Sequence, residues 1–149
     1  MHGPWLGAPL APLLGADHWY DIALDLESED SARAMAAYAT ALTLDPGHAD
    51  AHLNLGRLLH EAGRVPEAER HYRGALASDP GSAQASYNLG VALEDQRRSA
   101  EAVAAYEAAL RLDASLAAAH FNLSRLHEAA GRRTDALRHL ADYRRLQSG

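Results

Sequence analysis

Residues 52–80 read HLNLGRLLHEAGRVPEAERHYRGALASDP, and this stretch predicts two consecutive helices. The leucines of its first half recur at helical spacing up to Gly63, a residue suited to the left-handed position that follows a helix. Pro66 is compatible with the first turn of a second helix, and Pro80 ends that helix because proline cannot continue it. The stretch therefore predicts a helical hairpin.

The same pattern returns every 34 residues. Asn-Leu-Gly at residues 54–56 returns at 88–90, and as Asn-Leu-Ser at 122–124. The other matching positions include Gly63, Arg97 and Gly131; Ala34, Ala68, Ala102 and Ala136; and Tyr38, Tyr72, Tyr106 and Leu140. The matches define an apolar, proline-containing arm and four units, which are residues 1–14, 15–48, 49–82, 83–116 and 117–149. Because each unit predicts two helices, we expect four helix pairs.

Composition agrees with an all-α protein. Apolar and aromatic residues make up 48% of the 149 residues, which is enough for a core, and β-branched residues are few. The alanine-rich chain has no lysine, which is typical of a GC-rich bacterial genome. It also has no cysteine, so disulfides, thiolate catalysis and cysteine-based zinc sites are excluded.

The repeating pattern resembles the tetratricopeptide repeat family. In this 34-residue pattern, a small residue and Leu-Gly are followed by an alanine, an aromatic residue, a second alanine and a proline. The resemblance covers about 135 of the 149 residues; Ile22, Ser124 and Ala114 depart from the pattern. It implies an alpha-alpha superhelix, or solenoid, of four helix-turn-helix repeats whose first helices line a concave groove. A weaker similarity links the C-terminal half to the tetratricopeptide tails of bacterial mercury-resistance-type regulators, although the DNA-binding head of those proteins is absent.

The resemblance implies a non-enzymatic module that binds a protein or peptide ligand in the groove. Gly56 and Gly90 are expected to lie against the second helix of their own repeat, whereas the asparagines before them offer amide groups that can hold a peptide backbone. The residues predicted to bind a peptide are Asn54, Asn88, Asn122, Arg57, Arg125, Trp19, Tyr87 and Phe121. Each also has a structural interpretation: the asparagines as solvated groups or contacts between helices, the arginines as solvated charges, and the aromatic residues as packing between helices.

No catalytic, cofactor or metal site is predicted. The chain has no glycine-rich phosphate loop and no nucleophile elbow. His48 and His52 can share a helix face, but the sequence places no third ligand beside them. His18, His52 and His120 occupy equivalent positions near helix starts, which favours a packing or capping role.

Charge and the two ends of the chain give the remaining expectations. Residues 1–48 contain seven acidic residues and one arginine, whereas residues 117–149 contain three acidic residues and six arginines. The acidic overall balance argues against nucleic-acid binding, and the polarity raises the alternative of a self-assembling homo-oligomer with head-to-tail contacts. No membrane span or signal peptide is predicted, so a cytoplasmic location is expected. The last helix, residues 134–146, is predicted to cap the array itself, with Leu137 inward and His139 facing water.

Overall fold

A computed structural model describes residues 14–149. Over that range the chain forms eight α-helices and no strand. The helices are α1 (Ala16–Leu26), α2 (Ser31–Leu44), α3 (Ala49–Glu61), α4 (Val65–Ser78), α5 (Ala83–Asp95), α6 (Ser99–Leu112), α7 (Ala117–Ala129) and α8 (Arg133–Ser148). The predicted arm at residues 1–14 lies outside the described residues except for Leu14. None of the described helices is both long and apolar enough to cross a membrane.

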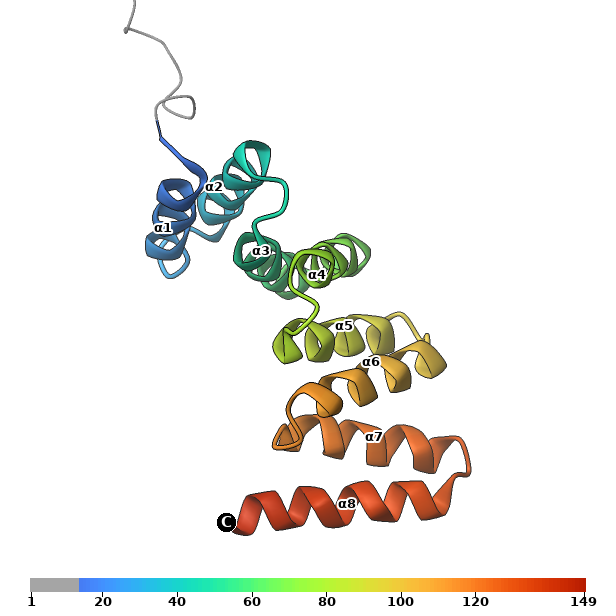
Figure 1. Cartoon of the computed structure of the whole chain (residues 1–149). Helices are drawn as coiled ribbons and strands as arrows, with labels where there is room; N and C mark the ends of the chain where they lie inside the picture. Colours follow the sequence, from blue (N-terminus) through green and yellow to red (C-terminus); the bar gives the residue numbers. More distant parts are fainter. Residues whose placement is uncertain (1–13) are drawn as a thin grey trace, which may run out of the picture.

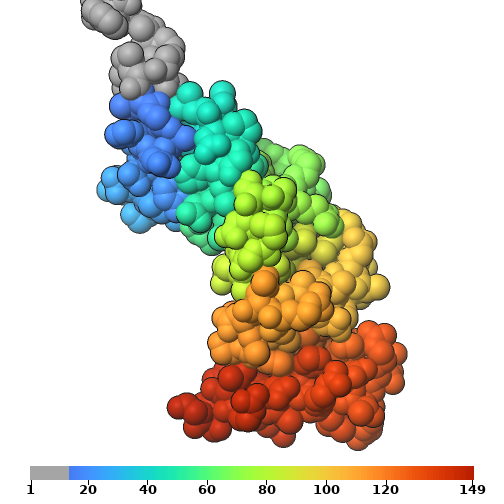
Figure 2. Space-filling model, in the orientation of Figure 1, coloured from blue at the N-terminus to red at the C-terminus, as the bar shows by residue number. Residues whose placement is uncertain are grey.

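The helices form four successive hairpins, named here repeat 1 (α1 and α2) to repeat 4 (α7 and α8). Each helix packs most extensively against the other helix of its hairpin and then against the next repeat. Helices α1 to α4 are seen nearly along their axes in Figure 1, whereas α7 and α8 are seen from the side, so the axes turn along the stack. The space-filling view shows an elongated body with α1 and α8 at opposite ends (Figure 2). The predicted all-α superhelix of four repeats is confirmed.

Short-range sequence signals begin and end these helices. The side chains of Asp30, His48 and Ser82 accept hydrogen bonds from backbone N–H groups in the first turns of α2, α3 and α5. Gly63 and Gly131 have φ angles of +82° and +78° after α3 and α7, as predicted for the left-handed position. Arg97 adopts the same conformation after α5, with φ of +61°.

The core is built from the repeating small and aromatic positions. Tyr38, Tyr72 and Tyr106 are buried between the helices of their own hairpins, beside buried alanines. A Cβ atom on Gly56 would lie 2.7 Å from Cε1 of Tyr72, and a Cβ on Gly90 would lie 2.6 Å from Tyr106. The prediction that these glycines lie against the second helix is therefore confirmed.

The last helix differs from its predicted orientation. Leu137 is 54% exposed, whereas His139 is only 8% exposed and packs against α7. The predicted inward position of Leu137 and outward position of His139 were wrong. His139 can occupy the interior of this hairpin because its ring forms a hydrogen bond with His120, on α7.

Candidate functional site

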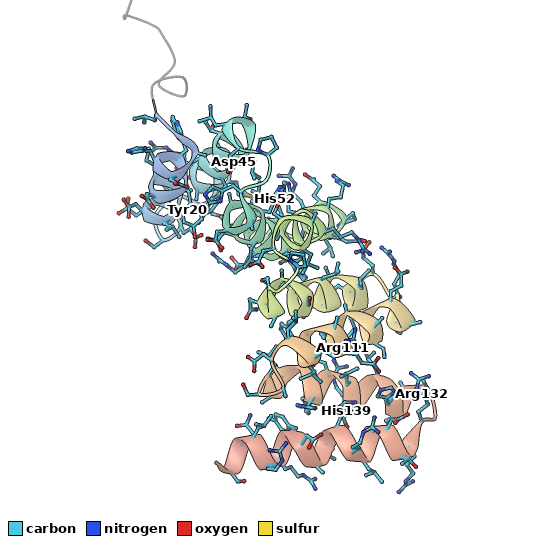
Figure 3. All side chains as sticks on the ribbon, in the orientation of Figure 1. Tyr20, Asp45, His52, Arg111, Arg132 and His139 are labelled. Carbon is cyan, nitrogen blue, oxygen red and sulfur yellow. The ribbon has the colours of Figure 1, made fainter. Side chains whose placement is uncertain are left out.

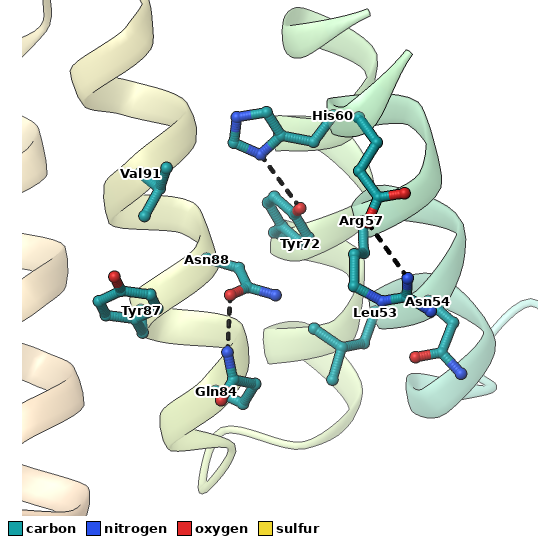
Figure 4. A pocket seen from close by; sticks show the side chains of 10 residues that line it. Leu53, Asn54, Arg57, His60, Tyr72, Gln84, Tyr87, Asn88 and Val91 are labelled. Carbon is teal, nitrogen blue, oxygen red and sulfur yellow. Dashed lines mark hydrogen bonds and ion pairs between the residues drawn. The ribbon is translucent and has the colours of Figure 1, made fainter. Parts of the chain in front are cut away.

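A pocket opens on the first-helix side of the stack, between repeats 2 and 3. Its volume is about 470 Å³. The lining residues come from α3, α4 and α5 and are Leu53, Asn54, Arg57, His60, Glu61, Tyr72, Gln84, Tyr87, Asn88 and Val91 (Figure 4). Four of the eight predicted binding residues are among them: Asn54, Arg57, Tyr87 and Asn88. The first helices therefore line this hollow, as the resemblance implies.

Asn54 and Asn122 are engaged within the chain. Nδ2 of Asn54 donates to the hydroxyls of Tyr20 and Tyr38, at 3.1 and 3.2 Å. Nδ2 of Asn122 donates in the same way to Tyr87 and Tyr106, at 3.3 Å each. Nδ2 of Asn54 is therefore used within the chain, which matches its alternative interpretation as a contact between helices. Tyr20, which interrupts the row of asparagines in sequence, is a partner of Asn54.

Asn88 has a different environment. Its Oδ1 accepts a 2.7 Å hydrogen bond from Gln84, one turn earlier on α5, and its amide projects toward α3 (Figure 4). The position equivalent to Tyr87 one repeat earlier is Leu53, which has no hydroxyl to accept from Asn88. Among the described residues, Nδ2 of Asn88 donates to no side chain, and it faces the pocket.

Arg57 and Arg125 are held in ion pairs between repeats. Arg57 contacts both carboxylate oxygens of Glu27, at 2.7 and 2.6 Å, and Arg125 contacts Glu94 at 2.8 Å. Tyr38 donates a hydrogen bond to Glu27, and Tyr106 donates one to Glu94 at 3.0 Å. Both arginines therefore complete networks that also contain Asn54 or Asn122, while their side chains remain 39% and 47% exposed.

The junction between repeats 2 and 3 replaces this network. His60 occupies the position equivalent to Glu94, and Val91 occupies the position equivalent to Arg57 and Arg125. Nε2 of His60 contacts Asp95 at 2.6 Å and donates to it, because a carboxylate can only accept. Nδ1 of His60 then accepts from the hydroxyl of Tyr72 at 3.2 Å. Burial raises the pKa of Tyr72 to about 12, which keeps this donor protonated.

The three predicted aromatic positions diverge. Tyr87 lines the pocket, and its ring packs against Tyr106 at a centroid distance of 5.5 Å. Trp19 is partly buried against the core and faces α2. Phe121 is 41% exposed, packs against Tyr143 and lies 5.9 Å from the guanidinium of Arg125. The structure therefore does not bring these three residues into one site.

Gln84 and Tyr72 line the pocket but were not among the predicted binding residues. Gln84 lies four residues before Asn88, a spacing that places two side chains together on a helix. From this spacing, the sequence could have predicted that Gln84 lies beside Asn88. Tyr72 belongs to the repeating aromatic positions, and the structure shows that its ring is buried while its hydroxyl reaches His60 at the edge of the pocket.

His48 and His52 do not form a joint site. Nδ1 of His48 accepts from the N–H of Ala51, and its Nε2 contacts Asp17 at 3.0 Å. His52 instead contacts His71, on α4. The contact of His52 agrees with the packing or capping role predicted for it, whereas the cap formed by His48 was not predicted.

Two family models cover the repeats. One described as tetratricopeptide repeat matches residues 25–86, and a second with the same description matches residues 62–117 and 87–149. The chain belongs to the tetratricopeptide repeat family. Repeats of this family are in general protein-interaction modules, and neither model indicates an enzyme. No curated protein matches the chain.

Solved structures of the same architecture include several of MamA. One crystal structure of MamA matches with a TM-score of 0.84 and 18% identity, over 89% of this chain and 78% of MamA. MamA from Desulfovibrio magneticus RS-1, residues 41 to the end, matches with a TM-score of 0.80 and 22% identity, over 89% and 76% of the two chains. At these identities, the similarity shows that the tetratricopeptide repeat fold is shared.

Proposed function

We propose that this tetratricopeptide repeat protein binds an extended peptide segment of a protein partner in the pocket between α3 and α5. The observation that carries the proposal is the changed chemistry of this junction. The other two junctions between repeats satisfy their asparagine with tyrosine hydroxyls. Here, Leu53 and Val91 leave Asn88 facing a hollow of about 470 Å³.

The lining suggests the chemistry of the ligand. Leu53, Val91 and Tyr87 form an apolar wall that suits one apolar side chain. The amide of Asn88 can donate to a peptide carbonyl without reading the sequence of the peptide. Glu61, whose side chain is 63% exposed, and the neighbouring Asp95 add negative charge at the edge, which favours basic or neutral polar residues beside the apolar one.

The three equivalent asparagines, Asn54, Asn88 and Asn122, have different proposed roles. Asn88 is the side chain proposed to contact peptide backbone, while Asn54 and Asn122 hold tyrosines and thereby position the first helices. Arg57 lines the pocket but is already paired with Glu27 and Glu61. Its proposed contribution is to hold one wall in place.

A pocket-closing variant tests this proposal. His60→Glu combined with Val91→Arg reproduces at this junction the carboxylate and arginine, Glu94 and Arg125, of the junction between repeats 3 and 4. We expect Tyr72 to donate to the new carboxylate and the new arginine to fill the hollow. Peptides are selected from a random display library on the unmodified protein. Their affinity for the variant, measured by fluorescence anisotropy, should be at least tenfold lower, while the far-ultraviolet circular dichroism of the variant equals that of the unmodified protein.

Asn88→Ala should weaken the binding of the same peptides, by roughly 1 kcal/mol for one lost hydrogen bond. Thr43→Ala, on the exposed face of α2, is the matched control and should leave the affinity unchanged. Peptides that bind equally well to the pocket-closing variant would show that the ligand lies elsewhere on the array.

The charge polarity supports a second candidate, self-assembly. The acidic excess in residues 1–48 and the arginine excess in residues 117–149 favour contact between the first repeat of one copy and the last repeat of another. Such an assembly should dissociate as salt screens the charges. Light scattering at low and high ionic strength measures this, and a monomer under all conditions would remove the candidate.

A further inference from the structure

Two histidines meet inside the last hairpin. His120, on α7, and His139, on α8 and labelled in Figure 3, are both buried, and their Nδ1 atoms approach to 3.0 Å. Two nitrogens at this distance require one to donate and the other to accept. The pair therefore holds one nitrogen lone pair in the interior of the hairpin.

The backbone determines which atom of His120 has the lone pair. Nε2 of His120 lies 3.2 Å from the carbonyl oxygen of Ala114, which can only accept, so Nε2 carries the proton. Nδ1 of His120 is then the acceptor and receives the N–H of His139. A histidine whose second ring nitrogen donates to a backbone carbonyl has the orientation that metal-binding histidines have.

Asp142, one turn after His139, adds an oxygen atom. Its Oδ2 lies 3.9 Å from Nδ1 of His120, and its Oδ1 pairs with Arg145 at 3.1 Å. One ligand atom from each of His120, His139 and Asp142 lies within 4.8 Å of the others. In the part of the chain from residue 14 onward, this is the one cluster of at least three such groups.

We propose that His120, His139 and Asp142 bind a divalent first-row transition metal ion such as Zn²⁺. Two imidazole nitrogens and one carboxylate oxygen suit this class of ion, with water as the fourth ligand. Two nitrogens at about 2.0–2.1 Å from a tetrahedral zinc are about 3.3 Å apart, so the rings need to separate by only a few tenths of an ångström. Neutral His139 would move its proton from Nδ1 to Nε2 and turn the freed lone pair to the ion.

Repeat 2 contains a matched pair without the carboxylate. Nδ1 of His52 and Nδ1 of His71 are 3.1 Å apart, and Nε2 of His52 lies 2.8 Å from the carbonyl oxygen of Pro46. The residue equivalent to Asp142 is Gly74, which offers no side-chain ligand. The chain thus contains a two-ligand control for the proposed three-ligand site.

Titration of the full chain, without a polyhistidine tag, tests the proposal. Isothermal calorimetry with Zn²⁺ should show one tight site per chain, and Co²⁺ should give visible absorption bands of a bound ion. Asp142→Asn should weaken the tight site at least tenfold, since even indirect partners of metal ligands contribute about 10–100-fold. Asp142 is only partly buried, so this variant should fold.

The two histidine pairs provide the comparison. His139→Ala should abolish the tight site, whereas His71→Ala should leave it unchanged, with circular dichroism confirming the helices of both variants. Two equivalent sites, or a site that Asp142→Asn does not weaken, would show that histidine pairs alone bind the ion and would overturn the three-ligand site. The absence of any tight site would also overturn it.

Discussion

Position 97 shows how one backbone angle affects this chain. Arg97 has φ of +61°, at the position where repeats 2 and 4 have Gly63 and Gly131. A side chain disfavours this conformation by about 1–2 kcal/mol, whereas glycine adopts it freely. Arg97→Gly should therefore increase the free energy of unfolding by about 0.5–1 kcal/mol, after the larger unfolded-state entropy of glycine is subtracted. Urea denaturation followed by circular dichroism measures the change.

Gly63→Ala is the reciprocal variant at the equivalent position. Apart from Gly63 and its two chain neighbours, no residue has an atom within 4 Å of a Cβ built on Gly63, so the substitution tests the backbone conformation. It should lower the free energy of unfolding by about 1 kcal/mol. If both substitutions shift stability in the same direction, the backbone explanation for this position is incorrect.

At the scale of the element, the hairpins depend on close contact between their two helices. A Cβ on Gly56 would lie 2.7 Å from the ring of Tyr72 and 3.3 Å from the carbonyl oxygen of Ala68. Gly56→Ala should therefore destabilise the protein by about 1–3 kcal/mol, through overpacking. This is the opposite of the gain of about 1 kcal/mol that helix propensity alone predicts. Thermal and urea unfolding of the variant and the parent protein distinguish the two signs.

Repeat 4 suggests the control for that prediction. Ser124 and Leu140 occupy there the positions of Gly56 and Tyr72. In a Tyr72→Leu background, Gly56→Ala should cost clearly less, because the ring that it displaces is gone. An equal cost in both backgrounds would show that the contact with Tyr72 does not determine the preference for glycine.

At the scale of the whole molecule, each repeat of residues 14–149 packs mainly against its neighbours, so stability is approximately a sum over hairpins and junctions. Buried tyrosines recur in the first three repeats, as Tyr38, Tyr72 and Tyr106. Burial raises the pKa of each hydroxyl, and that of Tyr72 reaches about 12. The unfolded chain releases these protons at about pH 10, whereas the folded chain retains them.

The contribution of these tyrosines to the free energy of unfolding should therefore be constant well below pH 10 and fall as the pH rises from 10 to 12. Denaturation at several alkaline pH values measures the slope, and tyrosinate absorbance should appear together with unfolding. Tyr72→Phe should make the slope shallower by one proton, whatever its effect at neutral pH. Tyrosinate absorbance at pH 10 to 11 with the helices intact would contradict the prediction.

The sequence by itself determined the architecture of this protein. A 34-residue period, with alanine, glycine and tyrosine at equivalent positions, specifies helical hairpins because each of those residues acts within its own hairpin. The ends of α3 and the packing of Gly56 and Gly90 were predictable for the same reason. These features depend on residues close in sequence, so pattern and propensity are sufficient.

Only the tertiary structure decided what the polar side chains do. Asn54, Asn88 and Asn122 are equivalent in sequence, yet two of them hold tyrosines and one faces a pocket. The repeat before Asn88 has Leu53 and His60, where the repeat before Asn122 has Tyr87 and Glu94. His120 and His139 likewise meet only because α7 and α8 pack together. Hydrogen bonds require geometry at the scale of tenths of an ångström between separate helices, and a repeat pattern does not specify this.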